Sequence, residues 1–544
     1  MAEHKGQNYL HGAAILAAGV IVMKILGLLY KMPIGNIIGD DGYSMFIATY
    51  NVYNVFLTLS TAGLPIALAR LISEANAQGR VNQVRRTFSV AWRTFFWIGL
   101  FSSLVMALFP RQIADHILHN PDAALSIRVM SPSVLLVCLV SAYRGYCQGF
   151  GDMIPTTVGQ VLEVLVKVVV GLLLAWLLMR GGRGKPMGSA GAIFGVTAGS
   201  AAALLYMWLY KLRRYRDAEQ GDDTPDPDAA IFRRFLRIGI PIALGSSVLA
   251  LLNLVDSSLC MGRLQGAARF SYQEAKELYG VYGKAQTIFN LPAAIITPLT
   301  ISVVPAVTAA IVKKQNDAAT AISEDSMRIA AVLSLPMGVG LAVLARPVMD
   351  LIYPGSHAVG GDLLMLLGVA SIFVCLVLME NAVLQATGHE LLPMITMIAG
   401  GVVKVVVNYF LVAERGVNIY GAAIGTLASY AVMAVVNFVM MCFVLDKNPR
   451  LRAILLRPSL CTAVMGAAAW AIHGLCMRLL PLRGRLSLLV STLAAILIAA
   501  AIYLAMSILL RTITREDMAL IPGGEKIARL LHVKAASAEP ESKN

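Results

Sequence analysis

The chain has 544 residues, of which 58% are hydrophobic and 14% charged, and its mean hydropathy is +0.71. Soluble globular proteins carry about a quarter charged residues, so this composition excludes an ordinary soluble enzyme and indicates an integral membrane protein. The net charge of +14 does not indicate nucleic acid, because the basic residues stand at the ends of apolar segments. Membrane-flanking loops beside anionic lipids favour that placement. We therefore expect the lipid bilayer as a partner and no nucleic acid.

Fourteen apolar segments are long enough to span a bilayer, which takes about 20 mainly apolar residues per helix. In chain order they cover residues 11–32, 44–67, 88–109, 126–148, 156–179, 189–211, 237–260, 281–311, 327–346, 361–386, 393–413, 420–445, 458–479 and 486–510. The chain is predicted to be an all-α, polytopic membrane protein. The domains expected from this pattern are a six-helix lobe, a linker, a second six-helix lobe, two added helices and a tail. They cover residues 1–212, 213–236, 237–445, 446–510 and 511–544.

The two lobes share sequence features in the same order. A Gln-x-x-Gly motif that ends in proline follows the fourth segment at 148–155 and the tenth at 385–393. Lys167 and Lys404 each stand in a Val-Lys-Val-Val-Val run of the next segment. Six segments separate equivalent positions, so the repeats are expected to insert with the same orientation. A pseudo-twofold axis normal to the membrane would relate them, with substrate between the lobes.

The distribution of lysine and arginine sets the expected orientation. With a cytoplasmic N-terminus, about twenty basic residues lie inside and about a dozen outside. An even number of spans then places both termini in the cytoplasm. The first apolar segment contains Lys24 and lacks a signal-peptide cleavage pattern, so we expect it to be retained.

Two lysines in the first segment are the strongest functional signal. A charge at the bilayer centre costs a few kcal/mol, so it usually faces a cavity or a partner. Lys24 and Lys31 are seven residues apart, which places both on one face of a helix. Several lysines that project into one cavity would suit an anionic phosphate or pyrophosphate, on which lysine acts as a point charge.

Four further ionisable residues are candidates to line the cavity or to take part in ion coupling. Glu163 and Lys167 are four residues apart, and the alternative for them is an internal ion pair without a function. Lys404 has no acid four residues before it. The alternatives for Lys404 are snorkelling to the interface or an ion pair with Glu380.

Asp256 and Asn253 offer oxygen ligands in the seventh segment. They could hold Na⁺ or carry a proton, and the alternative is an ion pair between Asp256 and a cavity lysine. No cofactor is expected, because the sequence has no zinc-type Cys/His cluster and no GxxxxGK[ST] loop. The seven cysteines are scattered through apolar segments and are expected to be buried apolar residues.

Four motifs carry a family resemblance. They are Lys-Ile-Leu-Gly-Leu-Leu-Tyr-Lys at 24–31, Gly-Asp-Asp-Gly-Tyr at 39–43, the helix end at 63–74 and the Gln-Gly-x-Gly motif at 148–155. Together they resemble the polysaccharide-biosynthesis branch of the multidrug/oligosaccharidyl-lipid/polysaccharide (MOP) exporter superfamily. Within that branch the likeness is greatest to proteins similar to stage V sporulation protein B and to lipid II flippases of the MurJ type.

The resemblance implies a flippase in the bacterial cytoplasmic membrane that acts in peptidoglycan biosynthesis and cell shape. Its substrate would be an undecaprenyl-pyrophosphate-linked cell-wall precursor, moved by alternating access with the membrane potential as a driver. It implies no enzyme activity, and we expect a monomer. Na⁺ binding by an acid of the seventh helix, which some members have, falls on Asp256 in this sequence.

The resemblance also implies a cavity with basic residues from helices one, two and eight. Lys24 falls on the first, Lys31 lies close to the second, and Lys284 is the candidate in the eighth. The second segment has no basic residue from 53 to 61, so Arg144 or Arg70 is expected to compensate.

Two other functions would need features that this sequence lacks. A cation-coupled multidrug exporter of the same superfamily would need an acidic, aromatic-lined pocket, and the pattern of Lys24 and Lys31 argues against one. A membrane glycosyltransferase or ligase would need a large outside loop with catalytic carboxylates. The longest outside loop expected, residues 261–280, is short for that role.

Overall fold

The computed structural model describes residues 2–214, 221–445, 449–479, 484–510 and 512. Within these residues the chain forms helices and no strand. Thirteen helical stretches there are long and apolar enough to cross a membrane, which confirms the polytopic all-α class. The predicted tail 511–544, except residue 512, and residues 215–220 of the predicted linker lie outside the described residues.

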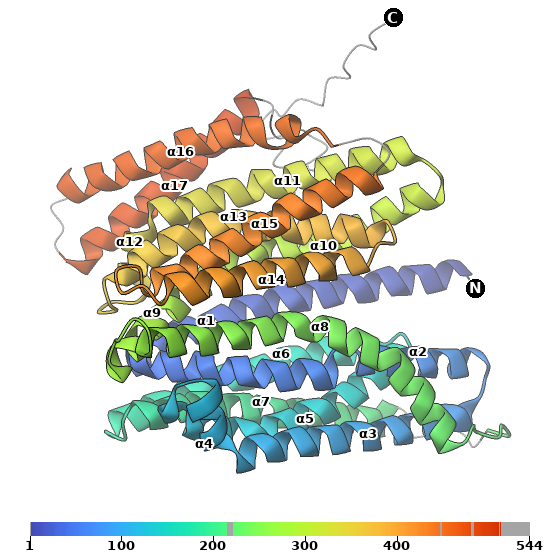
Figure 1. Ribbon diagram of the computed structural model, residues 1–544. Coiled ribbons are helices and arrows are strands. Elements are labelled where there is room, and N and C mark those ends of the chain that lie inside the picture. The colour runs from blue at the N-terminus through green and yellow to red at the C-terminus, as the bar shows by residue number, and fades with distance from the viewer. Residues whose placement is uncertain (1, 215–220, 446–448, 480–483, 511, 513–544) are drawn as a thin grey trace, which may run out of the picture. The chain divides into compact units, whose positions relative to one another are not determined.

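Figure 1 shows the helices, whose bounds are as follows. They are α1 (Ala2–Thr61), α2 (Leu64–Ala77), α3 (Val81–Leu108), α4 (Pro110–Gln112), α5 (Ala124–Gly149), α6 (Ile154–Arg180), α7 (Lys185–Arg214), α8 (Asp228–Gln265), α9 (Tyr272–Phe289), α10 (Leu291–Val312), α11 (Asn316–Val343), α12 (Ala345–Ile352), α13 (Val359–Ala386), α14 (Leu391–Leu411), α15 (Tyr420–Val444), α16 (Leu451–Leu479) and α17 (Arg485–Leu509). A π-helical turn (Ile113–Ile117) and a 3₁₀ turn (Pro121–Ala123) precede α5.

Two predicted segments are joined in the structure, and another is divided. The first two segments lie in one stretch, Val22–Ala77, which changes direction at Gly39 (φ 70°). A backbone with positive φ is readily adopted only by glycine. The predicted eighth segment, 281–311, is two helices that meet at Asn290, just before Pro292. The outside loop expected at 261–280 is shorter than predicted, because α8 continues to Gln265 and α9 begins at Tyr272.

The chain divides into two compact units. The first comprises Met1–Thr287 with Gly401–Gly425, and the second comprises Ile288–Gly400 with Thr426–Asn544. In the first unit α5 packs against α3 and α7, and α6 packs against α7 and α1 (Figure 1). In the second, α11 packs against α13 and α16, and α16 against α17. The units differ from the lobes inferred from the repeats, since α8 and most of α9 cluster with the first seven helices. The lobe boundaries therefore stay a prediction.

The repeated Gln-x-x-Gly motifs form the same turn at both places. Gly151 (φ 77°) and Gly388 (φ 83°) both adopt the left-handed conformation. Each donates its N–H to the carbonyl of the motif glutamine, Gln148 or Gln385, at 2.9 and 3.1 Å respectively. Both turns end a helix in the way that C-terminal glycines commonly do, as a duplicated segment would.

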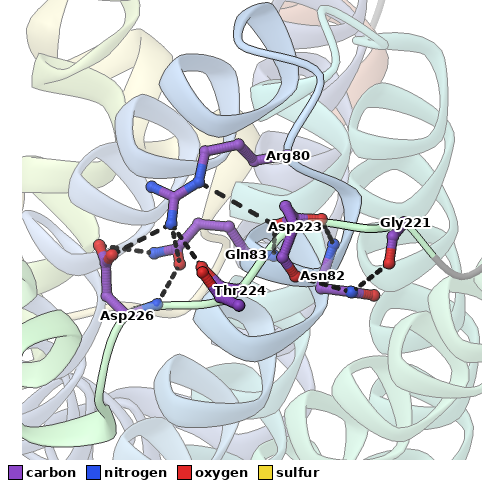
Figure 2. Close-up of polar contacts among 7 residues, drawn as sticks. All are labelled: Arg80, Asn82, Gln83, Gly221, Asp223, Thr224 and Asp226. Atoms are coloured by element: carbon purple, nitrogen blue, oxygen red, sulfur yellow. Dashed lines mark hydrogen bonds and ion pairs between the residues drawn. The ribbon is translucent and has the colours of Figure 1, made fainter.

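Residues 221–228 of the predicted linker contain four aspartates. This acidic part of the linker is anchored to the start of α3 (Figure 2). The Asp223 carboxylate accepts the backbone N–H of Asn82 at 2.8 Å and that of Gln83 at 2.9 Å. These N–H groups belong to the first turn of α3 and have no partner within the helix. The Arg80 guanidinium pairs with Asp226 at 3.1 Å and with Asp223 at 4.0 Å. Asp223 thus caps α3 from a segment about 140 residues away.

This capping lowers the pKa of the Asp223 carboxyl. Desolvation acts to raise the pKa, but the hydrogen bonds from Asn82 and Gln83 and the charge of Arg80 outweigh it. A carboxyl with a lowered folded-state pKa stabilises the fold above its unfolded pKa of about 3.9. That stabilisation is lost as the pH falls through the folded-state pKa.

We predict that Asp223→Asn speeds hydrogen exchange at the Asn82 and Gln83 amides at pH 7, because the cap weakens. Asp222→Asn is the matched control, since Asp222 is an exposed neighbour, and we expect no change there. The difference in melting temperature between wild type and Asp223→Asn should shrink as the pH falls below 4. Equal exchange in the two variants would contradict the capping role.

Candidate functional site

Glu163 on α6 pairs with Arg144 on α5. Arg144 Nη2 donates to Glu163 Oε2 at 2.7 Å, and Ser200 Oγ on α7 lies 3.3 Å from Oε1. The alternative of an ion pair between Glu163 and Lys167 is not found among these contacts, because Arg144 and Ser200 approach the two carboxylate oxygens. Glu163 still lies within electrostatic range of Lys167. Arg144 was predicted to bind substrate, but Glu163 neutralises its charge in this structure.

Three lysines of the first unit lie close together, with one in electrostatic range of the other two. Lys24 and Lys31 on α1 and Lys167 on α6 form no ion pair with any residue that the structure describes, and Lys31 lies within electrostatic range of the other two. We call Lys24, Lys31 and Lys167 the lysine cluster. Lys24 is exposed, whereas Lys31 and Lys167 are partly buried. The sequence placed Lys167 among the coupling residues, but the structure places it beside the candidate substrate lysines.

Aromatic side chains support the lysine cluster. The Lys167 ammonium lies over the Tyr30 ring, 5.7 Å from its centroid, a distance typical of a cation–π contact. The Tyr30 hydroxyl donates to the Ala192 carbonyl at 2.6 Å, which fixes the ring. Sequence reasoning missed Tyr30, although it directly precedes Lys31.

Asp256 on α8 is buried in a second polar cluster. Its Oδ2 lies 2.9 Å from Lys404 Nζ on α14, and its Oδ1 accepts a hydrogen bond from Asn408. The Cys260 thiol lies 3.8 Å from the same Oδ1. We call Asp256, Lys404 and Asn408 the Asp256 cluster.

The Asp256 cluster revises two predictions. The acid that pairs with Lys404 is Asp256, where the sequence suggested Glu380. Asn253 is exposed, and the amide beside Asp256 comes instead from Asn408. Asn408 could have been inferred, because it lies four residues after Lys404 on the same helix face.

The Asp256 carboxylate is already paired with a cation in this structure. A cation site needs oxygen ligands, but an ammonium and an amide N–H donate to the two carboxylate oxygens. Lys404 thus supplies the positive charge that an ion would supply. Of the two alternatives left open by the sequence, the geometry agrees with the ion pair.

Lys284 on α9 pairs with Asp40 at 2.5 Å and is only 3% exposed. Asp40 directly follows the turn at Gly39, and its neighbour Asp41 pairs with Lys185 on α7 at 2.6 Å. A Cβ atom at Gly280 would come within 1.9 Å of the Asp40 carbonyl oxygen. Lys284 was predicted to bind substrate, but in this conformation Asp40 neutralises it and α9 packs closely on the turn.

Two predicted site residues lie elsewhere. Arg70 on α2 is 66% exposed and pairs with Glu74 one turn later, at 3.2 Å. It therefore does not substitute for a basic residue in the second segment. Glu380 on α13 belongs to the second unit, is 2% exposed and lies beside Asn437. Its Oε2 has no hydrogen-bond partner among the described residues.

Comparison with known sequences decides the family. The profile of polysaccharide biosynthesis proteins matches residues 9–311, more than half of the chain. The chain belongs to the polysaccharide biosynthesis protein family. It is 26% identical over 525 residues to the uncharacterized membrane protein YabM of Bacillus subtilis, covering 96% of both chains. It is 22% identical to the lipid II flippase MurJ of the same organism, over 79% of this chain and 82% of the relative.

Solved structures confirm the fold of this family member. A structure of the lipid II flippase MurJ in an inward closed conformation matches with a TM-score of 0.68 and 14% identity, over 92% of this chain and 99% of the other. An inward-facing multidrug MATE transporter matches with a TM-score of 0.66 and 16% identity, over 80% and 98%. The chain therefore shares the fold of these two transporters.

We predict that removing one member of the buried Asp256–Lys404 pair lowers the free energy of unfolding more than removing both members does. Lys404→Met leaves a carboxylate without its cation and should destabilise the protein by about 3–5 kcal/mol. Asp256→Asn together with Lys404→Met should recover most of that loss. Thermal unfolding in detergent measures both, with Lys24→Met as the control for an exposed lysine. Additive losses would show that the two side chains do not interact.

Proposed function

We propose that this protein flips an undecaprenyl-pyrophosphate-linked cell-wall precursor, lipid II or a related lipid-linked oligosaccharide, across the cytoplasmic membrane. The observation that carries the proposal is the lysine cluster: three lysines on membrane-spanning helices that form no ion pair with the residues that the structure describes. Unpaired charge in such a place is costly. An anionic substrate group would relieve that cost.

Two acids, Glu163 and Asp256, have partners outside the lysine cluster, although Glu163 lies within electrostatic range of Lys167. Glu163 is engaged by Arg144 and Ser200, and Asp256 is engaged by Lys404 and Asn408. A substrate would therefore not have to displace an acid from an ion pair with these lysines. They would hold the pyrophosphate as point charges while the isoprenoid tail stays in the bilayer.

In an alternating-access cycle, the Asp40–Lys284 pair would act on the outward side of the protein. In the predicted orientation the turn at Gly39 lies on the outer side, and this pair holds α9 against it. We infer that the pair closes the outward path and separates when the substrate leaves. The membrane potential would act on the charges that move during this change.

The second candidate is a cation-coupled multidrug exporter, which the likeness to a MATE transporter favours. The lysine cluster opposes it, because three unpaired cations would repel a cationic drug. Efflux of a cationic dye that depends on Asp256 would support this candidate over the flippase.

We predict that Lys31→Gln lowers the rate of lipid II flipping by about ten-fold or more, since a hydrogen bond to a charged group contributes about 1.5–3 kcal/mol. Lys31→Arg keeps the charge and should retain most of the activity. Purified protein in vesicles that contain lipid II gives the rate, and growth of a flippase-depleted strain gives an independent readout. Arg70→Gln is the matched control, because Arg70 is an exposed surface residue. Wild-type flipping by Lys31→Gln would refute the proposal.

We further predict that joining α1 to α9 stops transport. A disulfide between Asp40→Cys and Lys284→Cys should abolish flipping, and a reductant should restore it. Each single cysteine variant controls for the seven native cysteines and for the loss of the ion pair. Undiminished flipping by the cross-linked protein would show that α9 does not leave the turn during transport.

A further inference from the structure

A groove of about 750 Å³ lies on the first unit, lined mainly by α3 and α8 and by no residue of the lysine cluster. Its walls are mostly apolar and include Leu59, Val90, Trp97, Phe232 and Ile240. Trp97 is 66% exposed and Phe232 is 42% exposed, so the groove opens on the membrane-facing surface of these spans. Its volume falls within the range of about 300–1,000 Å³ that is typical of small-molecule sites.

One end of the groove carries an excess of positive charge. Arg93 and Asp228 line it and form an ion pair at 3.4 Å. Arg86, two turns before Arg93 on the same face of α3, also pairs with Asp228. Two guanidinium groups thus share one carboxylate.

The charged end lies where a membrane interface is expected. Asp228 is the first residue of α8, and the acidic linker directly precedes it. Trp97 follows Arg93 by one helical turn, and Trp92 and Phe96 stack nearby with ring centroids 5.6 Å apart. Tryptophan gathers at the level of lipid headgroups. The groove therefore runs from the headgroup level into the hydrocarbon layer.

We propose that this groove binds a membrane phospholipid with an anionic headgroup. The acyl chain would lie between α3 and α8, and the phosphate would take the guanidinium hydrogen bonds that Asp228 leaves free. Basic pockets between membrane helices are known to hold anionic lipid headgroups. A phospholipid there would tie α8 to α3 beside the capped start of α3. This site does not depend on the proposed transport function.

Native mass spectrometry of the full chain in mild detergent tests the proposal, with phosphatidylglycerol and phosphatidylcholine as probes. Wild type should retain phosphatidylglycerol in preference to phosphatidylcholine. Arg86→Gln with Arg93→Gln should lower that retention by about five-fold or more for each charge removed. Arg213→Gln with Arg214→Gln is the matched control, because these are exposed arginines at the end of α7, and retention should not change.

Two further variants test the site in ways that a general loss of folding would not imitate. Asp228→Asn removes the competing carboxylate, so phosphatidylglycerol retention should rise by about five-fold. Ala229→Phe blocks the exposed mouth without altering charge and should lower retention. Equal retention of the two lipids, or equal losses in both arginine pairs, would overturn the proposal in favour of non-specific boundary lipid. Recovery of an isoprenyl pyrophosphate from the groove in place of phospholipid would overturn it as well.

Discussion

A charge within the hydrocarbon layer must meet an opposite charge, reach water or bind something that carries the opposite charge. Three basic side chains of the first unit satisfy this requirement by pairing with an acid. Arg144, Lys284 and Lys404 each meet an acid on another helix or across the turn at Gly39. Each such pair fixes the relative position of the segments that carry its two members. The lysine cluster is the exception, and for that reason it is the candidate site.

The pairing also separates residues that look alike in the sequence. Lys167 and Lys404 stand in identical five-residue runs, yet Lys404 is bound to Asp256 and Lys167 lies over the Tyr30 ring. The two lysines thus have different partners. Lys404 joins α14 to α8 through Asp256, and Lys167 joins α6 to α1 through Tyr30.

Much of the fold could be predicted from the sequence, because length and hydropathy identify a membrane span without knowledge of its neighbours. The breaks at Gly39 and Asn290 were harder, since an apolar run gives little sign of where a helix changes direction. The site was predicted in part. Lys24 and Lys31 were found from their seven-residue spacing, but the partners of Glu163, Lys284 and Lys404 come from elements distant in the sequence. Periodicity within one helix cannot identify such partners.

The close approach of Gly280 to the Asp40 carbonyl leaves no room for a side chain between the two backbones. A membrane that stores a proton gradient loses energy through any continuous file of water, however narrow. Where these two backbones pack directly on each other, there is no space for water between Gly280 and Asp40. Insulation against ion leakage would therefore restrict position 280 to glycine whichever substrate the protein carries.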